Sequence, residues 1–269
     1  MRLCVFAVMV GLMGLVGVAQ AQENWRTDPI WYDGLVEKAT YDAERVIYGR
    51  ARSYEAIIFT NKEQHDTATL TKSDKSTETV EVFKHNHLEV VPTPNYRYKF
   101  ATTSHLQTDN LALTRLDASS QEYCGTSFKQ YLRQPDGRSF EYFAFSYFPE
   151  EGRVTAQIEP ADQPIVPEDA LPLYTRNFPF DNPQDQAISL LPTQKSNRHV
   201  PHKPVNATLR YAGEDGDAHK VELVVDNAVR GTYWLAKDRQ HLMTRYEGAD
   251  GTKLTLKSLD RVDYWTRHE

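Results

Sequence analysis

The chain has 269 residues, 40% of them hydrophobic, and its 31 Lys and Arg residues against 37 Asp and Glu residues give a net charge of −6. This mildly acidic balance argues against the basic face that electrostatic binding of nucleic acid requires, so we expect no nucleic-acid partner. A chain of this length can bury a large core, either as one large β domain or as two small ones.

The N-terminus has the pattern of a secretory signal peptide. Arg2 precedes an uncharged apolar run over residues 3–19, and an Ala-Gln-Ala cleavage site follows. Residues 1–21 are therefore predicted to direct export, leaving residues 22–269 as a single β-rich domain in the periplasm or outside a bacterial cell. The alternative is that the run is kept as a membrane anchor, although it is slightly short for a span. After cleavage we expect no transmembrane segment, because no later stretch is long and apolar enough.

An alternation of apolar and polar residues then predicts antiparallel strands with one solvated face. It is clear in residues 54–60 and 96–103, and turn signals rich in Gly, Pro, Asn and Asp separate the runs. Residues 39–159 are accordingly predicted to form a first meander. Its last run, residues 140–148, is apolar on both faces, so both faces must be covered.

Residues 160–204 hold nine of the 14 prolines, yet they also carry many large apolar residues. A disordered linker would lack those anchors. We predict an ordered lid with short helices near residues 168–177 and 183–191, docked on the sheet. A tethering linker between two β halves is the alternative.

Short apolar runs at regular spacing predict a second meander over residues 205–265, which completes the same sheet. The predicted fold is therefore mainly β. It is an antiparallel curled sheet or half-open barrel with a proline-rich lid that carries short helices.

An apolar ligand pocket is expected between the lid and the sheet. Phe143, Phe145 and Tyr147 would line it, and Leu173 and Tyr174 of the lid would cover it. Small-molecule sites are usually concave, apolar and partly closed. The expected partner is a lipid or another hydrophobic small molecule, with an envelope protein as the other option, and no cofactor is expected.

Cys124 would be the only cysteine of the mature chain, so no internal disulfide can form. Free Cys is among the most buried residue types, and its immediate neighbours supply no cation that would stabilise a thiolate. We therefore expect Cys124 to be a buried structural group. The alternative is a catalytic nucleophile served by His85, His87 or His105 from a neighbouring strand.

His85 and His87 stand two residues apart in one predicted strand, with Glu89 on the same face. This His-x-His-x-Glu set is a weak candidate for a metal site, because a metal usually needs a fourth ligand. Val and Leu residues mark the opposite face as the core side. We expect the His face to be solvated and to bind no metal.

Lys84 and Asn86 interrupt that predicted core face. A buried Lys must find a carboxylate or lose its charge, and Glu122 is the expected partner, with Arg52 in the same cluster. A polar cluster of Arg52, Lys84, Asn86 and Glu122 is expected inside the sheet. It is either a polar site or an ion-pair network that fixes strand register.

Residues 30–150 resemble a family of exported bacterial proteins. The family pattern is a Tyr-Gly-x-x-Arg turn, a Lys-x-Asn strand, a Thr-x-x-Tyr-x-Tyr strand and a Ser-Gln-Glu-aromatic-Cys-Gly motif. The matching residues are Tyr48, Gly49 and Arg52; Lys84 and Asn86; Thr93, Tyr96 and Tyr98; and residues 120–125, where Tyr123 replaces the usual Trp. The resemblance implies export and no catalytic roles. A weaker likeness, at the level of the fold, links the second meander to periplasmic lipoprotein carriers of the LolA/LolB type.

These observations leave three functions open. The first is an exported, non-enzymatic cell-envelope protein that binds an apolar ligand or an envelope partner. The second is a hydrolase or transferase that uses Cys124. The third is a purely structural envelope component.

Overall fold

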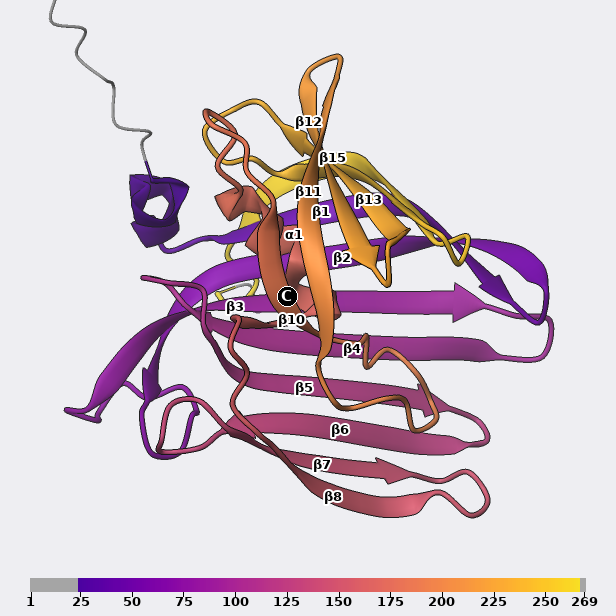
Figure 1. The fold of residues 1–269 in the computed structure, drawn as a ribbon. Coiled ribbons are helices and arrows are strands. Elements are labelled where there is room, and N and C mark those ends of the chain that lie inside the picture. Colours follow the sequence, from indigo (N-terminus) through magenta and orange to yellow (C-terminus); the bar gives the residue numbers. More distant parts are fainter. Residues whose placement is uncertain (1–23, 267–269) are drawn as a thin grey trace, which may run out of the picture.

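The computed structural model of the chain describes residues 24–266, so the predicted signal peptide lies outside the described residues. The chain forms one large, curled, unclosed β-sheet, as the alternation predicted (Figure 1). Two short 3-10 turns, η1 (Trp25–Thr27) and η2 (Pro29–Tyr32), precede it. The strands are β1 (Val36–Ile47), β2 (Arg50–Asp66), β3 (Thr79–Pro92), β4 (Arg97–Gln107), β5 (Leu113–Glu122), β6 (Gly125–Arg133), β7 (Phe140–Ser146), β8 (Gly152–Ile158), β9 (Ile165–Pro167), β10 (Gln186–Leu191), β11 (Val205–Asp215), β12 (Ala218–Val225), β13 (Ala228–Ala236), β14 (Met243–Gly248) and β15 (Lys253–Val262).

The two predicted meanders meet in the middle of this sheet. The strand order is β8-β7-β6-β5-β4-β3-β2-β1-β15-β14-β13-β12-β11-β10-β9, so β1 pairs with both β2 and β15. All neighbours are antiparallel except β9 and β10. The sheet curls so far that β9, at one edge, contacts β5 on the other side of the curl.

Tight turns between the strands follow from local sequence. The turn between β1 and β2 is Tyr48-Gly49, with φ values of 54° and 69°, and the turn between β12 and β13 is Asp226-Asn227, with φ values of 50° and 62°. Two-residue hairpin loops with positive φ at both positions match the right-handed twist of the flanking strands. Gly, Asn and Asp tolerate this conformation well, whereas Tyr48 adopts it at a cost.

The segment predicted to be a lid, residues 160–204, is ordered, and it supplies strands β9 and β10 at one edge of the sheet. Three short helical elements form its central part, which we call the plug: η3 (Glu168–Ala170), α1 (Leu171–Tyr174) and η4 (Thr175–Asn177). They match the first predicted helix, whereas the helix expected at residues 183–191 is wrong, because strand β10 occupies that stretch. No helix among residues 24–266 is long and apolar enough to cross a lipid bilayer.

The plug joins two clusters of buried side chains inside the curl. One cluster gathers residues of β1, β2 and β10–β15 and includes Leu171, and the other gathers residues of β3–β8 and includes Leu173. Tyr174 packs against both clusters. A buried ion pair fixes the end of the plug to β1: Arg176 donates two hydrogen bonds, of 3.1 and 2.6 Å, to the carboxylate of Glu37.

Residues 192–199, which we call the strap, cross the inner face of β5–β7 after β10. Lys129 is 1% exposed and donates from Nζ to the carbonyl oxygens of Gln194 and Ser196, at 3.1 and 2.5 Å. The hydroxyls of Ser127 and Ser146 donate to the carbonyls of Ser196 and Asn197. Strand side chains thus satisfy backbone groups of the strap that burial would otherwise leave without partners.

Because Lys129 is buried, we predict that its contribution to the stability of the folded chain rises at alkaline pH. Burial lowers the pKa of Lys129 from 10.5 to about 8. Between these values the unfolded chain binds more protons than the folded chain, so this residue's contribution to stability increases as pH rises. We therefore expect the unfolding free energy of the wild type to rise by about 3 kcal/mol, relative to that of Lys129→Met, as the pH increases over that range. Urea titrations at pH 7 and pH 10.5 measure it, and a difference that is constant with pH contradicts the burial of a titrating Lys129.

Candidate functional site

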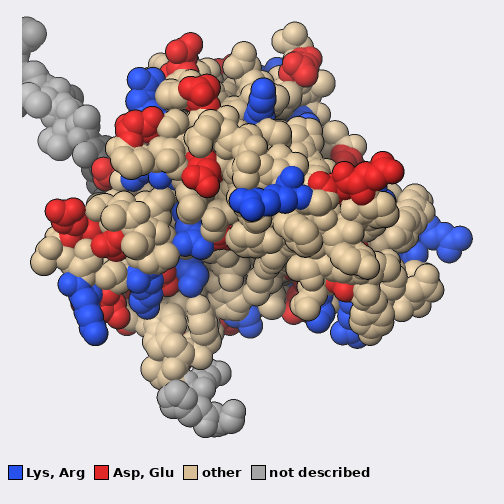
Figure 2. All heavy atoms as spheres, turned by 90° about the horizontal axis from the view of Figure 1, so that it is seen from below, with Lys and Arg blue, Asp and Glu red and all other residues tan. Residues whose placement is uncertain are grey.

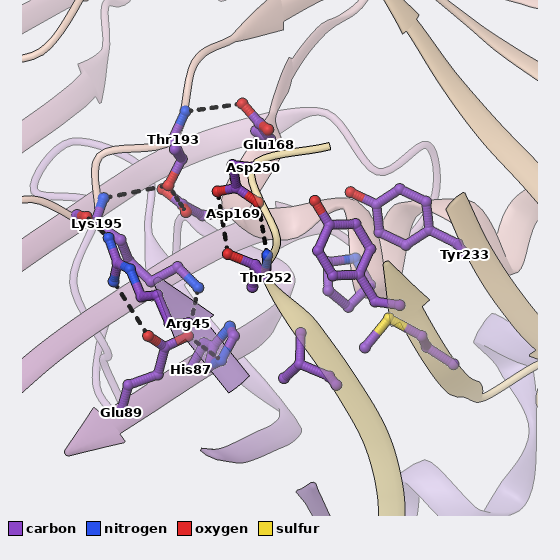
Figure 3. A pocket seen from close by; sticks show the side chains of 14 residues that line it. Arg45, His87, Glu89, Glu168, Asp169, Thr193, Lys195, Tyr233, Asp250 and Thr252 are labelled. Carbon is purple, nitrogen blue, oxygen red and sulfur yellow. Dashed lines mark hydrogen bonds and ion pairs between the residues drawn. The ribbon is translucent and has the colours of Figure 1, made fainter. Parts of the chain in front are cut away.

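A small polar cavity lies inside the curl, between β3, the plug, the strap and the β13–β15 region (Figure 3). Glu89 lies on its wall with 1% of its surface exposed. Lys195 Nζ lies 2.6 Å from Glu89 Oε1, His87 Nε2 lies 3.1 Å from the same oxygen, and Arg45 Nη1 lies 3.4 Å from Oε2. One carboxylate therefore faces two basic side chains and an imidazole.

These contacts determine which groups are charged. Burial alone would raise the pKa of Glu89, but Lys195, His87 and Arg45 together hold it well below its usual range. Burial, and then the charge of Lys195, lowers the pKa of His87. At neutral pH the cavity therefore holds a carboxylate between two cations and a neutral imidazole.

Carboxylates of the plug face the same cavity. Asp169 accepts hydrogen bonds from the backbone N–H of Gln194, at 2.8 Å, and from the hydroxyl of Thr193, at 2.5 Å. Burial raises the pKa of Glu168, and the charge of Asp169 adds to this effect. The cavity has a volume of about 80 Å³, whereas sites for small organic ligands usually measure about 300–1,000 Å³. Its size suits a few water molecules, and its polar groups tie the plug and the strap to β3.

The predicted orientation of β3 is wrong. His85, His87 and Glu89 point into the curl and are buried, whereas Lys84 and Asn86 lie on the outer face. The prediction took Val82 as a sign of the core side. Val82 is fully buried, but it lies on the outer face of the sheet. The Glu89 carboxylate is occupied by two cations, and His85 Nδ1 lies 3.0 Å from the hydroxyl of Thr60. The three residues thus form part of an internal polar network.

The predicted polar cluster is not formed either. Lys84 pairs with Glu63, at 3.3 Å, and Asn86 accepts a hydrogen bond from Thr103. Glu122 lies at the opposite end of these strands, where Asn197 of the strap donates to it at 2.5 Å. The cross-strand register places Lys84 opposite His105 and Lys99 opposite Gln121, which explains the separation.

An aromatic groove opens at the end of the curl where Glu122 lies. The groove is open to solvent. Its volume of about 370 Å³ falls within the usual range for small-molecule sites. The end of β1 and its turn to β2, the start of β4, the turn between β5 and β6, the loop after β7 and the strap all contribute to it. The residues that line the groove are Arg45, Val46, Ile47, Tyr48, Tyr96, Tyr98, Phe100, Cys124, Phe148, Ser196, Asn197 and Arg198.

A chain of hydroxyls runs along the groove. The hydroxyls of Tyr48 and Tyr98 share a short hydrogen bond, and those of Tyr96 and Tyr98 lie 3.3 Å apart. Cys124 donates from Sγ to the Tyr96 hydroxyl at 3.5 Å. This hydrogen bond, more than any other contact, raises the pKa of Tyr96 to about 12. Tyr96 is therefore neutral at physiological pH, and the tyrosine hydroxyls offer both donors and acceptors beside apolar rings.

Arg45 separates the groove from the polar cavity, since it lines both. Its guanidinium lies 4.6 Å from the centre of the Phe100 ring and donates to the carbonyl of Lys195 at 3.0 Å. Its other contact is the ion pair with Glu89. The inner end of the aromatic groove therefore carries a fixed positive charge.

The expectation that Cys124 is buried is wrong, because this residue is exposed. Tyr123 and Cys124 form the two-residue turn between β5 and β6, since Glu122 pairs directly with Gly125. The turn lies several residue positions along the strands from His85, His87 and His105, so the structure does not bring these imidazoles to the thiol.

The residues predicted to line an apolar pocket lie on two sides of the sheet. Phe143, Phe145 and Tyr147 face outward, and Phe145 and Tyr147 are 42% and 66% exposed. Leu173 is buried in the inner core, and Tyr174 packs beside it. The structure does not bring the two sets together, because the plug packs against the inner face of β7.

Sequence reasoning missed the residues that bring the groove together. Arg45 and Phe148 were not expected to meet the tyrosines of the family-like motifs. The signal lay in those motifs: the turn at Tyr48, the Tyr96–Tyr98 pair and the Cys124 turn line one groove. On the face shown in Figure 2, acidic and basic residues are interspersed and no large patch of one sign appears, so charge alone did not point to a site.

Comparisons with known proteins leave the site unassigned. No model of a known protein family matches the chain, and no curated protein matches its sequence. One similar solved structure is the crystal structure of a beta-barrel-like protein, from a domain of unknown function (DUF1849), of Brucella abortus. The TM-score is 0.48 at 7% sequence identity, over 85% of this chain and 98% of that one. The likeness to exported proteins with the Ser-Gln-Glu-aromatic-Cys-Gly motif therefore stays a prediction.

Proposed function

We propose that the protein is an exported, non-enzymatic envelope protein whose aromatic groove binds a small amphipathic molecule. The observation that carries the proposal is the groove itself: five separate segments of the chain place aromatic rings, tyrosine hydroxyls and two arginines around one opening. The predicted signal peptide supports export.

Exposure of the aromatic residues favours binding over a purely structural role. Tyr48 is 73% exposed and Tyr123 is 88% exposed, and the ring of Tyr123 lies 5.7 Å from that of Tyr96. Clustered exposed apolar rings cost free energy in water and mark sites of interaction. Tyrosine suits such sites, because each ring offers a large apolar surface and one polar end.

The charges around the groove indicate the chemistry of the ligand. Arg198 stacks on Phe148 with its guanidinium 4.1 Å from the ring centre, and its side chain is 60% exposed. Arg45 stands at the inner end, held by Glu89. An acyl chain or flat ring system with an acidic or hydrogen-bond-accepting end fits this arrangement, because its apolar part would cover the rings and its polar end would meet Arg198 or a tyrosine hydroxyl.

Cys124 offers a second candidate function, a thiol-dependent hydrolase or transferase. A thiol nucleophile needs a base within hydrogen-bond reach. The partner of Cys124 is the hydroxyl of Tyr96, a neutral group that accepts the thiol hydrogen. A binding role for the groove therefore accounts better for its geometry.

Titration of the mature protein with anilinonaphthalene sulfonate, followed by displacement with decanoate, tests the proposal. We expect saturable binding of one dye per chain and its competitive release by decanoate. Binding that does not saturate, or that decanoate does not reverse, contradicts a built ligand site. Binding of an envelope protein without any small molecule favours the partner alternative.

A further inference from the structure

A compact group of possible metal ligands lies on the outer face of the sheet, away from the groove. Glu63 and His65 come from β2, and His105 comes from β4. A nitrogen from each imidazole and one carboxylate oxygen all lie within 4.8 Å of one another. Val82 of β3 lies between the two strands, opposite Glu63, and its small side chain lets the imidazole rings approach to 4.6 Å between centres.

The two imidazoles have unused ligand atoms. Nδ1 of His65 and Nδ1 of His105 are buried and, within residues 24–266, have no hydrogen-bond partner. Nε2 of His65 faces the carboxylate of Glu63 at 3.4 Å. A buried polar atom without a partner costs about 1–3 kcal/mol and calls for an explanation. Coordination of a metal ion through Nδ1 would supply a partner to that atom.

The geometry of the cluster agrees with the charge states of two of its members, His105 and Glu63. Burial, with the neighbouring His65, lowers the pKa of His105 to about 3, so its ring is neutral. Burial alone would raise the pKa of Glu63, but the hydrogen bond with His65 and the charge of Lys84 bring it to about 2. Metal ions bind neutral imidazoles and ionised carboxylates.

The site is covered on one side and open on another. The carbonyl of Leu70, in the loop between β2 and β3, accepts a hydrogen bond from Arg115 on the outer face of β5, so this loop crosses the ends of β3 and β4. Glu63 and Lys84 also line an open groove on the surface. Ions and water can reach the carboxylate from this groove while the imidazoles stay buried.

We propose that Glu63, His65 and His105 bind a divalent transition-metal ion, most readily Zn²⁺. Two imidazoles and one carboxylate form a common set of three protein ligands for zinc, with water in the fourth position. Ligands around zinc stand about 3.3 Å apart, so small side-chain rotations must draw the three groups together. Lys84, 3.3 Å from Glu63, competes with the metal for the carboxylate.

Co²⁺ absorption and Zn²⁺ competition with a chromogenic chelator test this site in the mature protein without a histidine tag. We expect one metal ion per chain and d–d bands typical of four-coordinate Co²⁺. His105→Gln should weaken binding by at least about a hundredfold, since it removes a ligand outright. His219→Gln is the matched control, because His219 stands beside Glu214 at 3.7 Å in another part of the sheet.

A second variant keeps the test decisive if His105→Gln fails to fold. Lys84→Gln removes the competing ammonium and should tighten Zn²⁺ binding by about tenfold. Failure of the wild type to bind one equivalent of Zn²⁺ at micromolar concentration contradicts the site. The same holds if the Co²⁺ bands are unchanged in His105→Gln or if Lys84→Gln weakens binding. None of these results affects the dye titration, since the groove lies elsewhere on the sheet.

Discussion

Arg176→Leu is expected to lower the free energy of unfolding by about 3–5 kcal/mol, because it leaves the carboxylate of Glu37 buried without its partner. Both side chains are almost fully buried, and two hydrogen bonds join them. The deficit should shrink as pH falls. An unpaired buried carboxyl has a raised pKa, so the folded state then binds more protons than the unfolded chain.

The double variant Glu37→Leu/Arg176→Leu separates the ion pair from its burial cost. It should be much closer to the wild type than either single variant, because two apolar groups replace both charges. Arg210→Leu is the matched control: Arg210 also pairs with a glutamate, Glu222, at 2.6 Å, but its side chain is 46% exposed. An exposed pair contributes less than about 1 kcal/mol. Urea unfolding measures the stability of both single variants of the buried pair, of the double variant and of Arg210→Leu. Equal, small losses of unfolding free energy in Arg176→Leu and Arg210→Leu would show that the plug is not held by Arg176.

Tyr96→Asp is expected to abolish dye and decanoate binding in the groove. It replaces a ring of the wall with a second carboxylate beside Glu122, which disfavours both the apolar part and the acidic end of a ligand. Tyr48→Asn should weaken binding by about tenfold, the equivalent of about 1.4 kcal/mol. This change removes one exposed ring and places a residue that favours positive φ in the turn, so the fold should be retained or stabilised.

Phe145→Asp is the matched control for Tyr96→Asp. It makes the same kind of change at an exposed aromatic residue, but on the outer face of β7. Binding should be unchanged in Phe145→Asp if the groove is the site. Loss of binding in Phe145→Asp together with full binding in Tyr96→Asp would move the site to the outer face.

The fold could be predicted because it depends on local signals. Alternation along β2 and β4 and turns such as Tyr48-Gly49 specify strands and hairpins residue by residue. It could also be predicted that the two meanders belong to one sheet, because short connections join the consecutive strands of each meander. The helix expected at residues 183–191 failed because a short apolar run fits a buried strand as well as a helix.

The site could not be predicted, because it depends on which face of each strand is inside. On β3, Val82 is buried on the outer face and Glu89 is buried on the inner face, which reverses the usual meaning of apolar and polar positions. A one-residue change in register exchanges the two faces. The meeting of Tyr48, Tyr96 and Cys124 depends further on the registers of several strand pairs and on the curl, which no single segment encodes.

The rate of thiol modification of Cys124 tests the central claim most directly, because this exposed thiol lines the proposed binding groove. A small thiol reagent should label the native mature protein, and saturating decanoate should slow the reaction about tenfold or more. The double variant Cys124→Ser/Phe145→Cys carries its thiol on the outer face and should react at the same rate with and without decanoate. Protection of Cys124 alone is the result that the account predicts; an unchanged rate at Cys124 under saturating ligand, or protection only at position 145, would contradict it.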